Sequence, residues 1–374
     1  MKDSTGTYAW RLLLAALAVV AVLAIAACGD DNKDSSGDAA STDDTSTAAA
    51  DETPKKIGLL TTGTQNDKNW GEAFTIGAKA AADASGAKLT VVDNLNEPPQ
   101  YAQQGASLGQ EGYDMVLMAL GTIQEVQLKL AKQFPDTLWC GYGIAPDNAP
   151  ENTCFVDALQ EQAAFLGGVA AGLATKTNVI GAVNGFEFPQ LTRQPEAYAL
   201  GARCVNPDVT FVQKYINSWT DAALGKAAAK GLISQKADVL LAPLTTATNG
   251  LIAAARESDG VWVMPEYFDS NDTAKEVILT SVLFDLQTLA EDVYTKGLNG
   301  DLKPGEMLPY TLAELPDGGV APFYEDEAVL GADGVAKVDE IKQKIIDGDI
   351  KVPSTDEIGT VGTGSKIDPA SIGC

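Results

Sequence analysis

Histidine is absent from the 374 residues of the chain. This absence excludes Ser-His-Asp and Cys-His nucleophilic catalysis, zinc sites built on histidine and a histidine general base. The sequence also lacks the G-x-x-x-x-G-K-[ST] loop that cradles phosphates. We therefore predict a protein that is not an enzyme, needs no cofactor and binds no metal ion.

Basic residues are scarce as well, with 26 Lys and Arg against 51 Asp and Glu and a net charge of -25. Such a surface repels phosphate backbones, so nucleic acid is not expected as a partner. Part of the acidic excess lies in residues 29–54, a segment without aromatic side chains. It cannot bury enough apolar surface to offset the entropy cost of ordering, so we predict a disordered acidic tether.

The longest apolar run, LLLAALAVVAVLAIAAC at residues 12–28, follows Lys2 and Arg11. A charged start, an apolar centre and small residues before a cleavage point are typical of a secretory signal peptide. A cysteine at the end of the run resembles the signal of bacterial lipoproteins, in which that thiol is lipidated. We therefore predict that residues 1–28 are a signal peptide ending in the lipobox Cys28. The protein would then be lipid-anchored to the cell membrane on its extracytoplasmic face. The alternative is a plain membrane helix, although about 17 residues is short for a span.

Apart from Cys28, four of the five cysteines remain, an even number that suits disulfides in an oxidising compartment. We favour the pair Cys140–Cys154, because both lie at expected strand ends that flank one loop. This choice leaves Cys204–Cys374, which would fix the end of the chain to the body. Buried free thiols are the alternative.

From Lys56 onwards, short apolar runs alternate with helical stretches. Buried strands are predicted at 57–62, 89–93, 115–120, 137–142, 179–183, 209–216, 237–243 and 261–266. Helices are predicted over 69–84, 99–111, 122–133, 158–175, 189–204, 221–234, 246–257 and 335–347, and residues 278–298 form a strand that runs into a helix. This alternation predicts an α/β protein with two doubly wound parallel-sheet lobes.

The two sets of strands also predict the division of the chain. We assign residues 55–175 to an N-terminal lobe, with a return segment at about 278–300, and residues 176–277 to a C-terminal lobe. Residues 301–374 form a C-terminal segment with a late helix and tail. Ligands of open α/β sheets bind beyond the carboxyl ends of the strands, so two facing lobes would enclose one cleft.

The residues that follow these strands are the candidates for binding. Asn66 and Asp67 precede the first helix and could cap it, and Trp70 in its first turn would stack on a planar ligand. A core position for Trp70 and a capping role alone for Asp67 are the alternatives. Thr122 follows the third strand.

Candidates from the second set of strands are mostly aromatic. Phe186 or Phe188 would supply a second aromatic wall, unless they pack under a helix. Trp219 follows the next strand. Tyr267 and the carboxylate of Asp269 come after the last strand, where a carboxylate would accept hydrogen bonds from vicinal hydroxyls or a base edge. A turn-forming role is the alternative for Asp269.

Seven stretches together resemble the basic membrane protein family, also called PnrA-like or Med, of substrate-binding lipoproteins of ABC importers. They are IGLLTTGTQNDKNWGEAFTIGAKAA, GYD (112–114), AKQFPD (131–136), FLGGVAAGLATKTNVIGAVNGFEFPQLTR (165–193), LGARCVNPDV (200–209), INSWTD (216–221) and ILTSV (278–282). The resemblance implies a periplasmic-binding-protein type I fold, two lobes joined by a hinge, and capture of a purine nucleoside or purine base for an ABC permease. It places the family's first-loop aromatic on Trp70 and its loop acid on Asp67.

The sequence departs from the nucleoside-binding branch of that family. Trp70-Gly71 replaces a Phe-Asn pair, Tyr267 replaces the first aspartate of a late motif, and Phe284 replaces a lysine expected to contact ribose. TTATNG replaces a glycine-rich loop at residues 245–250. The family is therefore better defined than the ligand.

These observations predict a monomeric, lipid-anchored receptor for a small aromatic ligand, with an ABC permease as its partner. Trp70 with Phe188 or Phe186 would stack the base, Asp67 and Asp269 would accept hydrogen bonds, and Trp219, Tyr267 and Phe284 would close the wall. One alternative is a receptor of the same fold that signals to a membrane partner. Another is a carboxylate-based nucleosidase that uses Asp67 and Asp269.

Overall fold

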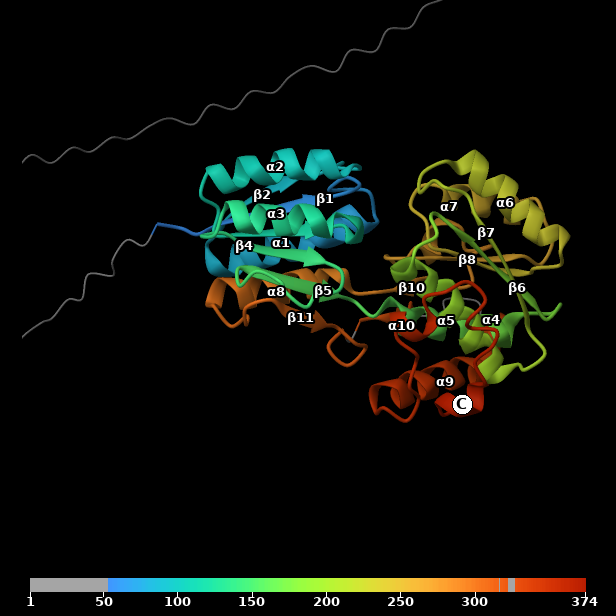
Figure 1. Ribbon diagram of the computed structural model, residues 1–374. Helices are drawn as coiled ribbons and strands as arrows, with labels where there is room; N and C mark the ends of the chain where they lie inside the picture. Colours follow the sequence, from blue (N-terminus) through green and yellow to red (C-terminus); the bar gives the residue numbers. More distant parts are fainter. Residues whose placement is uncertain (1–52, 316, 322–326) are drawn as a thin grey trace, which may run out of the picture. The chain divides into compact units, whose positions relative to one another are not determined.

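Two parallel sheets organise the chain in the computed structural model, which describes residues 53–315, 317–321 and 327–374 (Figure 1). The predicted signal peptide, Cys28 and nearly all of the predicted tether lie outside the described residues. A helix both long and apolar enough to cross a membrane is not found in the described part of the chain. The prediction of an α/β fold with two parallel sheets is confirmed.

The first sheet has six parallel strands in the order β11-β5-β4-β3-β1-β2. They are β1 (Lys56–Thr61), β2 (Lys88–Val92), β3 (Met115–Ala119), β4 (Leu138–Tyr142), β5 (Thr153–Asp157) and β11 (Glu306–Pro309). One face is covered by α1 (Trp70–Ser85) and α8 (Leu286–Asn299) and the other by α2 (Pro98–Gln110), η1 (Gly121–Ile123) and α3 (Gln124–Gln133). Because helices cover both faces, the central strands read as continuous apolar runs.

The second sheet has four parallel strands in the order β7-β6-β8-β9. They are β6 (Val179–Asn184), β7 (Thr210–Tyr215), β8 (Val239–Ala242) and β9 (Trp262–Pro265). Its helices form two pairs, α4 (Gln160–Ala174) with α5 (Pro189–Val205) and α6 (Ala222–Ser234) with α7 (Thr248–Arg256). Glycine permits the close packing of α4 on α5, since a Cβ on Gly168 would lie 1.9 Å from the carbonyl oxygen of Tyr198.

The remaining elements are short or lie near the C-terminus. They are η2 (Asn271–Thr273), β10 (Val282–Leu283), β12 (Gly319–Val320), α9 (Glu327–Ile346), α10 (Thr355–Ile358) and η3 (Pro369–Ile372). β10 and β12 pair antiparallel. Helix α9 begins earlier than the sequence predicts and is kinked at Gly331, whose φ is +70°. Strands β11 and β12 were not predicted, since β12 has only two residues and β11 is an edge strand beside β5.

The predicted end of the N-terminal lobe at residue 175 differs from the packing of α4. This helix contacts α5, α9, β8, β10 and β12, all of them on the side of the second sheet. The chain therefore passes from the first sheet to the second near Leu159, which has a φ of +35°. Helix α4 is apolar on nearly every side, so its sequence does not indicate which sheet it covers.

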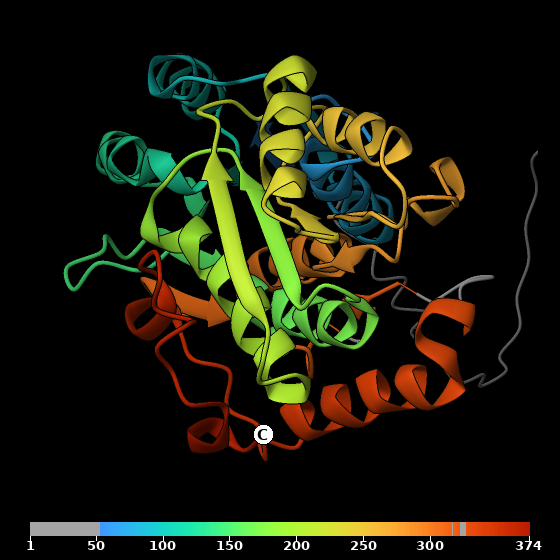
Figure 2. The same ribbon diagram turned by 90° about the vertical axis from the view of Figure 1, so that its right-hand side faces the viewer.

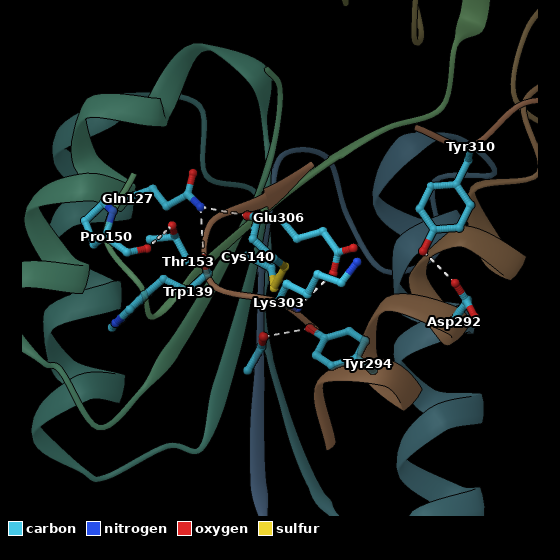
Figure 3. The surroundings of a disulfide bond; sticks show 12 residues. Gln127, Trp139, Cys140, Pro150, Thr153, Asp292, Tyr294, Lys303, Glu306 and Tyr310 are labelled. Atoms are coloured by element: carbon cyan, nitrogen blue, oxygen red, sulfur yellow. Dashed lines mark hydrogen bonds between the residues drawn. A yellow bond between two sulfur atoms is a disulfide. The ribbon is translucent and has the colours of Figure 1, made fainter. Parts of the chain in front are cut away.

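Two disulfides are present, with the pairings that the sequence analysis favoured. Cys140 and Cys154 face each other on neighbouring strands β4 and β5. Figure 3 shows Gln127 beside them, where its amide donates to the carbonyl oxygens of Trp139 (2.9 Å) and Cys154 (3.0 Å). The second disulfide joins Cys204 at the end of α5 to Cys374.

The C-terminal segment lies along the second lobe (Figure 2), where polar contacts as well as this disulfide hold it against α5. The buried carboxylate of Glu196 accepts the backbone N–H groups of Gly362 (2.8 Å) and Gly364 (2.7 Å). Arg203 donates to the carbonyl oxygens of Gly364 and Ile367, both at 3.1 Å. The end of the chain is thus part of the second lobe.

Candidate ligand-binding site

Trp70 lies at the first position of α1, where the sequence analysis expects a ligand-stacking ring. Its indole N–H donates to the carbonyl oxygen of Ala119, at the end of β3, over 2.7 Å. The side chain is 9 % exposed. Its ring centroid lies 4.9 Å from Phe74, 4.9 Å from Tyr142 at 79° and 5.9 Å from Tyr267 at 88°. Trp70 therefore joins aromatic groups from both sheets.

These rings form one group that we call the aromatic cluster, consisting of Trp70, Phe74, Tyr142, Tyr267 and Phe284. The rings of Tyr267 and Phe284 are 5.4 Å apart at 71°. Tyr142 ends β4 in the first sheet, and Tyr267 follows β9 in the second. The cluster thus stands where the carboxyl ends of strands from both sheets meet, which is where open α/β sheets bind ligands.

Tyr267 has a strained backbone, with a φ of +80°. A side chain in this left-handed region costs about 1–3 kcal/mol and persists only where the surroundings impose it. Its N–H donates to the carbonyl oxygen of Val282 over 2.9 Å, which holds the end of β9 against β10. The strain directs this ring into the aromatic cluster, and such outliers concentrate at binding sites.

Glu266 directly precedes Tyr267 and has an unusual environment. Its side chain is 3 % exposed, and neither carboxyl oxygen has a hydrogen-bond partner in the described residues. Burial raises the pKa of Glu266 well above its ordinary value. Burial also raises the pKa of Tyr267, and the nearby charges of Glu266, Tyr142 and Asp67 raise it further. Glu266, Tyr142 and Asp67 thus each lie within electrostatic range of the phenol of Tyr267.

A second polar group adjoins the aromatic cluster at Tyr142. The hydroxyl of Tyr142 donates to Asp157 over 3.4 Å. Arg193 donates to both carboxylate oxygens of Asp157 and, over 2.8 Å, to the hydroxyl of Thr355 in α10. The Nε of Arg193 is 3.1 Å from a carboxylate oxygen of Glu161. Burial raises the pKa of Glu161 to about 7, although the positive charge of Arg193 opposes this rise.

Asn66 is positioned differently from what its sequence suggests, whereas Asp67 accepts the N–H of Glu72 in the first turn of α1. The helix cap is Asn69, whose side chain accepts the N–H of Trp70 over 2.9 Å. Asn66 is exposed and accepts the hydroxyl of Thr64, so its predicted capping role is wrong. An Asn three residues before the true cap offers the same local hydrogen-bonding chemistry, which the sequence does not separate.

Asp67 organises the loop from within. Its carboxylate accepts the backbone N–H groups of Thr64 (3.1 Å), Asn69 (2.8 Å) and Glu72 (3.1 Å). Burial raises its pKa, and these hydrogen bonds oppose the rise. Glycine is needed at position 63, where φ is +71° and a Cβ would lie 2.2 Å from the carboxylate. Most of the accepting capacity of Asp67 is therefore used by its own loop.

Phe186 and Trp219 form a separate aromatic pair at the ends of β6 and β7. Their ring centroids are 5.1 Å apart at 55°, and Phe186 is 37 % exposed. The indole ring lies over Gly185, where a Cβ would be 2.0 Å from it. Within the described residues, no ring contact joins this pair to the aromatic cluster.

The other predicted residues lie apart from both groups. Phe188 is half-buried and precedes α5, where its carbonyl oxygen accepts the N–H of Thr192 over 2.9 Å. Thr122 is exposed and borders a surface groove between α2 and α3. Asp269 is exposed and accepts the N–H of Asn271 over 3.0 Å, which is the turn-forming role that the sequence left open.

Several observations bear on chemistry at this site. A nucleosidase would need Asp67 and Asp269 as opposed catalytic acids, but one serves its loop and the other a turn. The pentapeptide GASLG at 105–109 has the spacing of a nucleophile elbow, but it lies inside α2 rather than between a strand and a helix. In the described residues, no group of His, Cys, Asp and Glu is arranged to hold a metal ion.

Comparison with known proteins agrees with this arrangement. Residues 54–356 match the family model Bmp, described as ABC transporter substrate-binding protein PnrA-like. The chain is 27% identical to the ABC transporter nucleoside-binding protein BmpA of Lactococcus lactis, over 69% of this chain and 76% of that protein. It is 26% identical to a purine-binding protein of Brucella abortus, over 52% of this chain and 55% of that protein.

Solved structures show the same fold. A solute-binding protein of an ABC transporter system from Aeropyrum pernix superimposes with a TM-score of 0.69, covering 80% of this chain and 93% of that one at 21% identity. The family consists of extracytoplasmic binding proteins rather than enzymes, each with a small-molecule ligand and a permease partner. The chain belongs to the Bmp family of PnrA-like ABC transporter substrate-binding proteins.

Proposed function

We propose that this protein captures a purine base or purine nucleoside and delivers it to its permease. The observation that carries the proposal is the aromatic cluster at the strand ends of both sheets, with the unpartnered carboxyl group of Glu266 beside it. Stacked rings supply large apolar contact, and a few polar groups set orientation, as in most small-molecule sites. The names of the nucleoside-binding and purine-binding relatives support the same class of ligand.

Each side chain has a proposed role. Trp70 and Tyr267 would receive the flat base, because their rings come from different sheets and already touch. Phe186 and Trp219 would supply a second wall when the lobes rearrange around the ligand. Asp67 would act mainly by fixing the loop that presents Trp70, since its oxygens already accept three N–H groups.

The proposal includes the location of the protein. Cys28 would carry the lipid, and residues 29–54 would let the binding lobes reach a permease in the same membrane. The protein would act as a monomer. Labelling cells with a fatty-acid probe tests the anchor: wild-type protein should be labelled, and the Cys28→Ser variant should not. Labelling of that variant would refute the anchor while leaving the ligand proposal intact.

Titration calorimetry of Trp70→Ala tests the stacking role. Loss of one stacking ring costs about 1–3 kcal/mol, so the affinity for adenine or adenosine should fall roughly 5- to 150-fold. Trp262→Ala is the matched control, because Trp262 begins β9, at the opposite end of that strand from Tyr267. Equal losses in both variants would contradict a direct role for Trp70.

A further inference from the structure

The surroundings of Glu266 indicate which edge of a ligand the site would recognise. This inference rests on the proposed function. The residue is 3 % exposed, and both of its carboxyl oxygens are buried without hydrogen-bond partners in the described residues. A buried polar group without a partner is costly, by about 1–3 kcal/mol and more when charged. A ligand that satisfied both oxygens would remove this cost.

The charges around Glu266 decide which form the carboxyl group takes. Glu161 is buried to a similar extent, but it lies 3.1 Å from the guanidinium of Arg193. For Glu266 burial is the only cause of the raised pKa among the described residues, with no contribution from a cation, and the phenol next to it in the chain is that of Tyr267. An acid buried without a counter-charge retains its proton.

We propose that Glu266 acts as a neutral carboxylic acid, which selects a ligand edge with an acceptor beside a donor. A protonated carboxyl group offers one O–H donor and one C=O acceptor side by side. Purine bases present the complement, a ring nitrogen beside an amino group in adenine or a carbonyl beside an N–H in hypoxanthine. Vicinal sugar hydroxyls favour the ionised form, which accepts two donors. Glu266 would therefore read the base rather than the sugar.

The neighbouring aromatic groups support this assignment. Tyr267 follows Glu266 directly, and its strained φ of +80° places its ring 5.9 Å from Trp70 and 5.4 Å from Phe284. The aromatic rings thus offer flat faces on which a base can stack, and the carboxyl group of Glu266 offers hydrogen bonds to the edge of that base. A base held between such rings would direct its edge at Glu266, whereas a ribose would use contacts elsewhere.

Glu266→Gln and Glu266→Leu together test the proposal. Glutamine keeps a donor beside an acceptor without any charge, so its affinity for adenine should stay within about threefold of wild type. Leucine removes both groups, so its affinity should fall at least about tenfold. Glu151→Gln, at an exposed loop position, controls for the loss of an acid elsewhere. Equal losses in the Gln and Leu variants would overturn the proposal, since they would show that the ionised form is needed.

Two further measurements distinguish failure of this inference from failure of the proposed function. Wild-type affinity for adenine should fall as the pH rises through the raised pKa of Glu266, because the carboxyl group then ionises, and the Gln variant should abolish that fall. Affinity for ribose or glucose that exceeds affinity for adenine would overturn the proposal.

The second readout needs no ligand. Infrared difference spectra of wild type minus Glu266→Gln near neutral pH should show the carbonyl band of one protonated carboxyl group, while the band of Glu161, whose pKa is raised to about 7, is common to both proteins and cancels. Failure to bind any purine with this band present would refute the proposed function alone, whereas absence of the band would overturn the inference itself.

Discussion

Replacement of Arg193 by methionine tests whether the polar group beside Tyr142 holds the two lobes in register. Arg193 lies in α5, yet it donates to Asp157 at the end of β5 and to Thr355 in α10, and it pairs with Glu161 in α4. Four elements thus depend on one guanidinium group. Methionine has a similar length and preserves the packing of the side-chain stem.

The expected decrease in the free energy of unfolding follows from the two buried acids that the substitution leaves without a cation. Asp157 is 4 % and Glu161 2 % exposed, so both acids would remain buried without their cation. Removal of one partner from a buried ion pair costs about 3–5 kcal/mol, because the remaining charge is uncompensated. We expect a decrease of that size in the free energy of unfolding at neutral pH. The decrease should shrink in acid, where protonation of both carboxylates removes the unpaired charges.

Urea denaturation followed by circular dichroism measures this change. Arg256→Met is the matched control, because Arg256 pairs with Glu276 on the surface, where both side chains are at least half exposed. A surface pair contributes about 0–1 kcal/mol, so the control should barely shift the midpoint. A loss below about 1 kcal/mol for Arg193→Met, or a loss that grows in acid, would refute the reasoning.

Three further predictions concern stability. Burial raises the pKa of Glu161 to about 7 from 4.5, so its contribution to stability is present below pH 4.5 and lost as pH rises to 7. Unfolding curves of the wild type should show a decrease of up to about 3 kcal/mol in the free energy of unfolding over this pH range, and Glu161→Gln should abolish that decrease. Replacing both Cys140 and Cys154 by alanine should lower the free energy of unfolding by about 2–4 kcal/mol in urea, and reductant should then shift the unfolding midpoint of this variant only through the remaining Cys204–Cys374 disulfide. Gly168→Ala should lower the melting temperature, since its Cβ would collide with the backbone of Tyr198; an unchanged melting temperature would contradict the close packing of α4 on α5.

Most of the fold could be predicted because helices cover both faces of each sheet. Buried parallel strands then appear as apolar runs, and amphipathic helices alternate with them. The sequence did not indicate that α4 covers the second sheet, since that helix is apolar on nearly every side. Short strands such as β11 form mainly because an existing sheet edge accepts them.

The candidate site was predicted only in part. Trp70, Tyr267 and Phe284 come together in the structure, as expected of large aromatic residues that follow strands. Tyr142 was missed because it ends a strand as one more apolar residue, and Glu266 because it was counted as the last residue of the predicted strand at 261–266. Whether an acid serves its own loop or a ligand depends on which N–H groups surround it, and only the folded chain sets this.

Titration calorimetry of the wild-type protein tests the central claim most directly. The part of the chain after the predicted tether would be unfolded and refolded to remove retained ligand and then titrated with adenine, hypoxanthine, adenosine, inosine, ribose and glucose. We predict saturable binding with one site for at least one purine compound and weaker or no binding of the sugars. Binding of a sugar in preference to every purine, or no heat with any purine for correctly folded protein, would contradict the claim.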